Sequence, residues 1–118
     1  MNKLKIMAKH LGKLPKEGDY FINIHCKTEK EVGIIMNGFK RIGLDVWECA
    51  LCRDYKEAWE DFETSNCKHF YVCVDYESLI NNEEYDSLCF DTATYYTLPS
   101  ITFIEATRVL KKIREELR

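Results

Sequence analysis

Three stretches of the chain place apolar residues three and four positions apart, which is the spacing of one face of an α-helix. They are residues 28–43, residues 54–63 and a segment that starts at Thr102. The first and the last open on a Thr-x-x-Glu capping box, and Gly43 is suited to end the first helix. The expected apolar faces consist of Val32, Ile35, Met36, Phe39 and Ile42; of Tyr55, Ala58, Trp59 and Phe62; and of Phe103, Ala106, Val109 or Leu110, Ile113 and Leu117.

Other stretches have the alternation or the β-branched and aromatic content that is typical of strands. Residues 19–26 alternate apolar and polar positions, and residues 44–51 and 68–76 are rich in strand-forming residues. Residues 87–98 are expected to form one or two further strands that stop at Pro99. The helix between strands 19–26 and 44–51 suggests a right-handed crossover and a parallel pair.

Two segments keep alternatives open. Residues 3–13 fit a short amphipathic helix with lysines on its polar side, but they also fit a strand. Residues 77–86 indicate a loop or a broken helical turn. The resulting order is β-α-β-α-β-β-α. We therefore predict one α+β domain over residues 1–118, with a three- to five-stranded mixed sheet and two or three helices mainly on one face.

The length of 118 residues and the apolar content of 46% match one domain with a modest core. No run of apolar residues reaches the ~18 needed to cross a bilayer, and no secretory signal is evident, so we expect a cytoplasmic protein that does not insert in a membrane. In that compartment the six cysteines are expected to be free thiols or ligands.

Charge changes the picture, because it is unevenly distributed along the chain. Residues 1–16 form a basic N-terminal segment with five lysines and no acid, whereas residues 54–91 hold eleven acids against two lysines. The net charge of −3 conceals this asymmetry. Such a layout concerns the partners of a protein more than its fold. We expect the N-terminal lysines to be a solvated face and expect no direct binding of nucleic acid.

The acidic middle of the chain also carries aromatic residues, which is the composition of a protein-binding surface. We expect these acids to face the same way and to bind a basic groove of a host protein; the alternative is that they are merely solvated. The predicted partner-binding residues are Asp54, Glu57, Glu60, Asp61, Glu63, Asp75, Glu77, Glu83, Glu84 and Asp86.

One set of residues has a spacing that zinc sites use. Cys49-x2-Cys52 is followed by Cys67-x-His69, and together they make a formal Cys3His set. The alternative is that the cysteines are buried apolar residues. A redox role for the Cys49–Cys52 pair is disfavoured by the flanking acids Glu48 and Asp54, which oppose a thiolate.

Signatures of catalysis are missing from the sequence. No histidine lies in a recognisable nucleophile motif, and the five glycines form no phosphate-binding loop. We therefore expect no catalytic residues and no cofactor.

The succession "GDYFINIHCKTEKEVGIIMNGFKRIGLDVWE", "HFYVCVDY" and "YYTLPSITFIEATRVLKKI" resembles the layout of small accessory proteins of bacteriophages and mobile elements. The resemblance covers residues 18–113. It implies an origin and no residue roles: nonstructural phage proteins of this size are often anti-CRISPR or other anti-defence inhibitors, or sponges for nucleotide signals.

These observations give three hypotheses. The first is a phage-type inhibitor that binds a host defence or nucleic-acid-handling protein through the acidic residues of segment 54–91. The second is an oligomeric sponge for a nucleotide signal, and the third is a zinc-stabilised regulatory module. Candidate residues of the sponge are Lys27, Lys40, Arg41, Arg53 and Tyr95.

Overall fold

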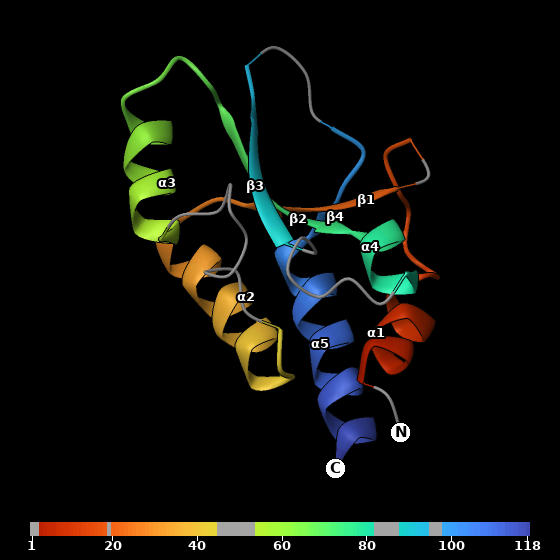
Figure 1. Cartoon of the computed structure of the whole chain (residues 1–118). Helices are drawn as coiled ribbons and strands as arrows, with labels where there is room; N and C mark the ends of the chain where they lie inside the picture. Colours follow the sequence, from red (N-terminus) through yellow and green to blue (C-terminus); the bar gives the residue numbers. More distant parts are fainter. Residues whose placement is uncertain (1–2, 19, 45–53, 82–87, 95–97) are drawn as a thin grey trace.

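A computed structural model describes residues 3–18, 20–44, 54–81, 88–94 and 98–118 of the chain. The described residues form helices and strands in the order α1, β1, α2, α3, β2, α4, β3, β4, α5 (Figure 1). The helices are α1 (Lys3–Leu11), α2 (Glu29–Arg41), α3 (Tyr55–Glu63), α4 (Tyr76–Ile80) and α5 (Phe103–Leu117). The strands are β1 (Phe21–Cys26), β2 (His69–Asp75), β3 (Leu88–Ala93) and β4 (Ile101–Thr102).

The strands form one mixed sheet in the order β3-β2-β1-β4. Strand β2 pairs antiparallel with both β1 and β3, and β4 pairs parallel with β1. The predicted α+β class with a mixed sheet is confirmed. The predicted second strand, residues 44–51, falls almost wholly outside the described residues. The parallel partner of β1 in the structure is the short strand β4.

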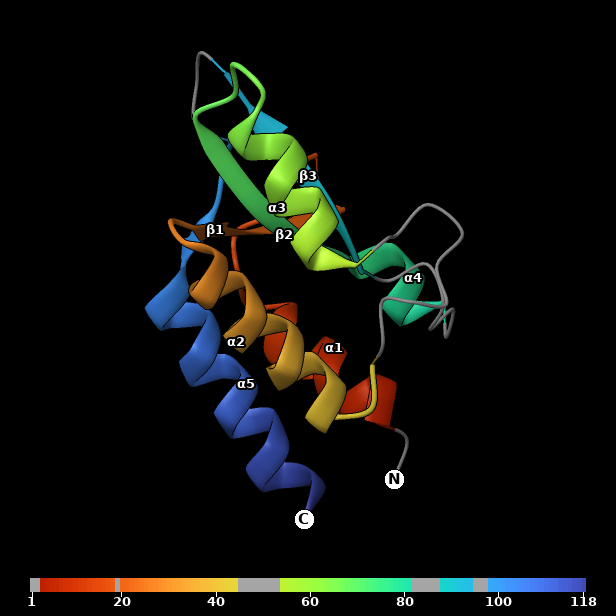
Figure 2. The same ribbon diagram turned by 90° about the vertical axis from the view of Figure 1, so that its left-hand side faces the viewer.

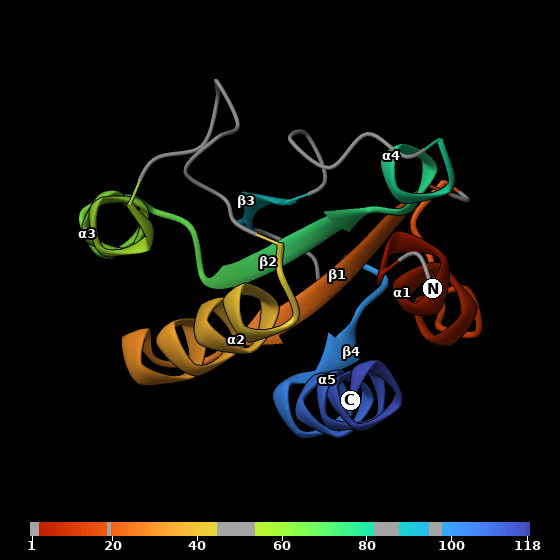
Figure 3. The ribbon, with the colours of Figure 1, turned by 60° about the horizontal axis from the view of Figure 1, so that its bottom comes forward.

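The helices cover mainly one face of this sheet, as predicted, but the described residues form five helices where two or three were expected, because the N-terminal segment and residues 76–80 are also helical. Helix α5 lies between α1 and α2 and packs against both (Figures 1 and 3). The side chains at alternate positions of the strands, among them Ile24, Val72 and Leu88, point into this layer and join residues from all five helices in one core. Burial of this apolar surface is the main stabilising contribution to the fold.

Local sequence signals set the helix ends. Thr28 accepts the backbone N–H of Glu31 at 3.1 Å, and Thr102 forms a complete capping box with Glu105. Gly43 adopts a φ of 93°, and the N–H groups of Gly43 and Leu44 return to carbonyls of the last turn of α2. This Schellman arrangement needs a residue without a Cβ at the left-handed position, which explains the glycine.

Three parts of the chain either differ from the sequence-based prediction or decide between its alternatives. The N-terminal segment is a helix, because α1 packs against both α4 and α5 and buries Leu4, Ile6, Met7 and Leu11. The last strand lies beyond Pro99, where a two-residue pairing with β1 leads directly into α5. The 77–86 segment begins as the short helix α4.

The second face of the sheet also holds buried residues. Tyr71 and Cys73 of β2 pack there with Ala93 and Leu98. The Tyr71 hydroxyl accepts the backbone N–H of Leu98 at 3.0 Å, and the Asn23 amide donates to the carbonyl of Pro99 at 3.1 Å. The residues that lead into β4 therefore lie over this face and satisfy its buried polar groups.

Candidate functional site

Helix α3 presents most of its carboxylates to solvent. Its inner side buries Ala58 and Trp59, and the Trp59 ring packs against Phe62 and Phe70. Glu57 and Glu60 are exposed on the outer side. An amphipathic helix held by two aromatic rings is a rigid support for these charges.

The other predicted acids of α3 have partners of their own. Asp54 caps the helix by accepting the backbone N–H of Lys56 at 3.0 Å. The indole N–H of Trp59 donates to the Glu63 carboxylate. Both acids remain exposed, so they still contribute negative charge to the surface around α3. We call the set Asp54, Glu57, Glu60, Asp61 and Glu63 the α3 acidic face.

The remaining predicted acids are not part of this face. Asp75 ends β2 and caps α4 by accepting the N–H of Ser78 at 3.2 Å, and Glu77 lies on α4. Helices α3 and α4 lie beyond opposite ends of strand β2 (Figure 3), and α4 packs against α1. The structure therefore separates the described acids into two groups. The predicted residues Glu83, Glu84 and Asp86 lie outside the described residues.

The predicted zinc ligands are only partly described. Cys49 and Cys52 lie outside the described residues. The Cys67 sulfur contacts the Thr94 hydroxyl at 3.4 Å, and His69 Nδ1 lies 3.3 Å from His25 Nε2. In the described part of the chain, no three His, Cys, Asp or Glu side chains are grouped so that they could hold a metal ion. The zinc site stays a prediction that depends on residues 49 and 52.

The histidine pair belongs to the second face of the sheet, where His25 and His69 are neighbours on adjacent strands. Their ring centroids are 5.3 Å apart, and His25 is also 5.3 Å from the Tyr71 ring. Burial and the neighbouring His69 and Lys27 lower the pKa of His25, because they disfavour its charged form. The alternation within 19–26 predicted that His25 lies on the polar face of its strand, but the pairing with His69 depends on the β1–β2 register.

Helices α2 and α5 enclose a groove of about 580 Å³ on the outer side of the helical layer. Sequence reasoning missed this site, except for Arg41 among the sponge candidates. Lys40 and Arg41 lie in the last turn of α2, whereas Lys27 precedes its first turn, so the described sponge candidates do not form one cluster. Arg53 and Tyr95 lie outside the described residues. The groove is lined by Ile34, Asn37, Gly38, Arg41, Thr107, Leu110, Lys111, Arg114, Glu115 and Arg118.

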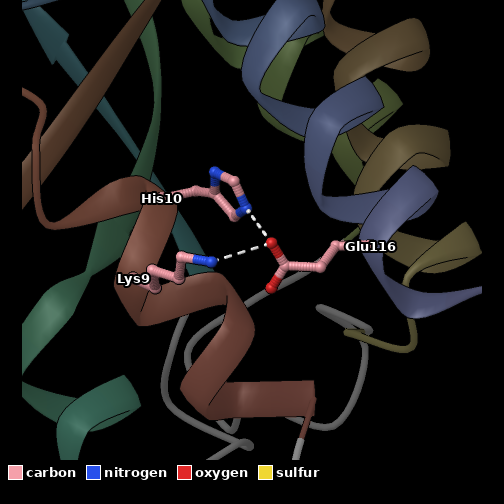
Figure 4. A network of polar contacts seen from close by, with 3 residues as sticks. All are labelled: Lys9, His10 and Glu116. Atoms are coloured by element: carbon pink, nitrogen blue, oxygen red, sulfur yellow. Dashed lines mark hydrogen bonds and ion pairs between the residues drawn. The ribbon is translucent and has the colours of Figure 1, made fainter.

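A polar network on the other side of α5 joins it to α1 (Figure 4). One oxygen of Glu116 accepts from Lys9 Nζ at 3.0 Å and lies 3.2 Å from His10 Nε2. These hydrogen bonds lower the pKa of Glu116. The carboxylate of Glu116 is thereby held toward α1 and away from the groove between α2 and α5.

Comparison of the chain with protein-family models, with curated proteins and with solved structures gives no match. No helix in the described part of the chain has both the length and the apolar character that a membrane span requires.

Proposed function

We propose that this chain is a non-enzymatic binding protein of phage type. Its α3 acidic face binds a basic surface of a host defence or nucleic-acid-handling protein in the cytoplasm, and this binding inhibits the partner. The observation that carries the proposal is the concentration of charge on α3, where Asp54 and four glutamate or aspartate residues of the helix stand against one lysine, Lys56.

The spacing of these charges suits a groove that normally holds nucleic acid. Ten residues of helix extend over about 14 Å, so five carboxylates give roughly one negative charge per 3 Å. A single nucleic-acid strand carries about one phosphate per 3.4 Å. Lysines and arginines placed to neutralise phosphates would therefore meet a similar density of charge on α3. Charge complementarity of this kind increases the rate of association and discriminates against other partners.

The experiment is affinity capture from a bacterial lysate with immobilised wild-type protein and two double variants. The test variant is Glu57→Lys/Glu60→Lys, and the control is Glu29→Lys/Glu77→Lys, which makes the same change of net charge at exposed positions of α2 and α4. We expect the wild type and the control to retain the same partner and the test variant to lose it. Addition of duplex DNA should compete with the capture.

Retention of the same partner by the Glu57→Lys/Glu60→Lys variant would overturn the proposal. Capture that duplex DNA does not reduce would show that the partner surface is not a nucleic-acid groove. The zinc-stabilised module remains a separate hypothesis, and metal analysis of the purified chain before and after Cys49→Ser tests it, because loss of a ligand removes a structural zinc.

A further inference from the structure

Helices α2 and α5 pack closely at one of the positions that line the groove between them. A Cβ atom at Gly38 would lie only 2.8 Å from Leu110 Cδ1, so a glycine permits the close contact. Leu110 is buried, whereas Ile34 on the groove side of α2 is 43% exposed. The groove thus has an apolar wall that is open to solvent. Its volume lies within the roughly 300–1,000 Å³ that small-molecule sites occupy.

Charge in this groove is strongly unbalanced. Arg41, Lys111, Arg114 and Arg118 line it, and Glu115 is the carboxylate among the lining residues. Among the described residues no ion pair joins any of these four cations to a carboxylate. The next acid along α5, Glu116, is bound to α1. A chain with a net charge of −3 therefore keeps a local excess of positive charge here.

The helix dipole explains only part of this arrangement. Cations near a helix C-terminus are favourable, and this accounts for Arg41 and Arg114 in the last turns of α2 and α5. Lys111 stands about two turns before the end of α5, where the dipole effect has faded. Lys111, Arg114 and Arg118 also follow one another at spacings of three and four, at which like charges repel. An anion in the groove would relieve that repulsion.

The lining changes in character along the groove. The chain direction of α2 and α5 is the same (Figure 2), so Arg41, Arg114 and Arg118 gather at one end. Toward the other end lie Ile34, the Asn37 amide and Thr107, whose hydroxyl donates to the Ile104 carbonyl at 2.8 Å and keeps its acceptor capacity. A complementary ligand has an anionic part and a planar part with hydrogen-bonding edges.

We propose that this groove binds a phosphate-bearing small molecule of the nucleotide class. The guanidinium groups of Arg41 and Arg114 hold the phosphates through paired N–H donors, a geometry that suits phosphate oxygens. The base lies against Ile34, and the Asn37 amide contacts its polar edge. An extended acidic peptide would need cations along the whole groove, whereas here they gather at one end. The site is independent of the α3 acidic face, so either proposal can fail without the other.

The test is isothermal titration calorimetry of the full chain with ATP and cyclic di-AMP, and with pyrophosphate, a single-stranded oligonucleotide and a polyglutamate peptide as comparison ligands. The test variant is Arg41→Ala/Arg114→Ala. The matched control is Arg108→Ala/Lys112→Ala, which removes the same charge from exposed positions of α5 outside the groove lining. We expect the wild type and the control to bind one of the two nucleotides with equal affinity. The test variant should bind that nucleotide about 100-fold more weakly, because each lost charged contact weakens binding by roughly tenfold.

A third variant separates recognition of the base from recognition of the phosphates. Asn37→Ala should weaken binding of the nucleotide several-fold and leave binding of pyrophosphate unchanged. All variants change exposed side chains, and circular dichroism checks that each one is folded. The proposal is overturned if the wild type binds neither nucleotide at millimolar concentration or if the test and control variants bind alike. It is also overturned if pyrophosphate, a single-stranded oligonucleotide or a polyglutamate peptide binds more tightly than the nucleotides.

Discussion

Replacement of Tyr71 by phenylalanine tests how the second face of the sheet is closed. The ring of Tyr71 is fully buried, and its hydroxyl oxygen accepts the backbone N–H of Leu98 at 3.0 Å. Leu98 is itself 8% exposed, so water has little access to that N–H group. Tyr71→Phe keeps the ring and removes one acceptor, which makes it a narrow perturbation.

The expected cost follows from the unsatisfied donor. A buried N–H group that loses its partner costs about 1–2 kcal/mol, since its hydration is not restored. The ring remains in place, and therefore no cavity term is added. An unfolding entropy of about 2.1 cal/mol/K per residue over 118 residues corresponds to a shift of about 4 °C for each kcal/mol. We expect Tm to fall by about 4–8 °C.

The assay is thermal and urea unfolding followed by circular dichroism, together with hydrogen exchange of the Leu98 amide. The matched control is Tyr20→Phe, because Tyr20 is 50% exposed and its hydroxyl has no hydrogen bond to another described residue. The control should stay within about 0.5 kcal/mol of the wild type. A Tyr71→Phe variant with unchanged stability and unchanged protection of Leu98 would refute the closure of this face by the Tyr71–Leu98 hydrogen bond.

Three further predictions concern titration, reactivity and capping. The pKa of His25 is lowered from 6.5 in the folded protein, so the unfolded chain binds more protons than the folded one just below that pH. The free energy of unfolding should therefore fall on acidification from about pH 6.5. A pH series of urea melts should show a smaller fall for His25→Gln. Hydrogen bonds to nearby hydroxyls lower the pKa of Cys67, whereas burial raises the pKa of Cys26 to about 12. Peptide-level mass spectrometry should therefore find Cys67 alkylated by iodoacetamide well before Cys26. The reverse order would contradict these environments. Thr102→Ala removes the capping box of α5 and should cost about 1 kcal/mol in a urea melt, while no loss would show that the cap adds nothing.

Much of the local structure could be predicted from residues close together in sequence. The Thr28 and Thr102 caps and the Gly43 terminus satisfy backbone groups that lie only a few residues away in the sequence. These patterns can therefore be recognised without knowledge of the tertiary structure. Periodicity correctly predicted α2, α3, α5 and β1, because each helix buries one side and β1 alternates along its length. Strand β2 is buried on both faces, and its β-branched and aromatic content predicted it.

The candidate sites depend on contacts between distant segments. The groove combines Arg41 with Arg114, and no local pattern indicates that α2 and α5 are neighbours. The acids of residues 54–63 and of residues 75–77 belong to one acidic stretch of the sequence, yet β2 carries the chain across the sheet and separates α3 from α4. Which charges share a surface is therefore a property of the packing.

The sequence by itself thus determined the α+β class, the caps and the unequal distribution of charge, since hydrogen bonds and periodicity act over a few residues. Only the tertiary structure decided that β4 pairs with β1, that α1 is a helix, and that cations from two helices meet in one groove. The physical reason is that burial and electrostatic interaction depend on distance in space, and the side chains that share a core or a groove come from segments far apart in the chain.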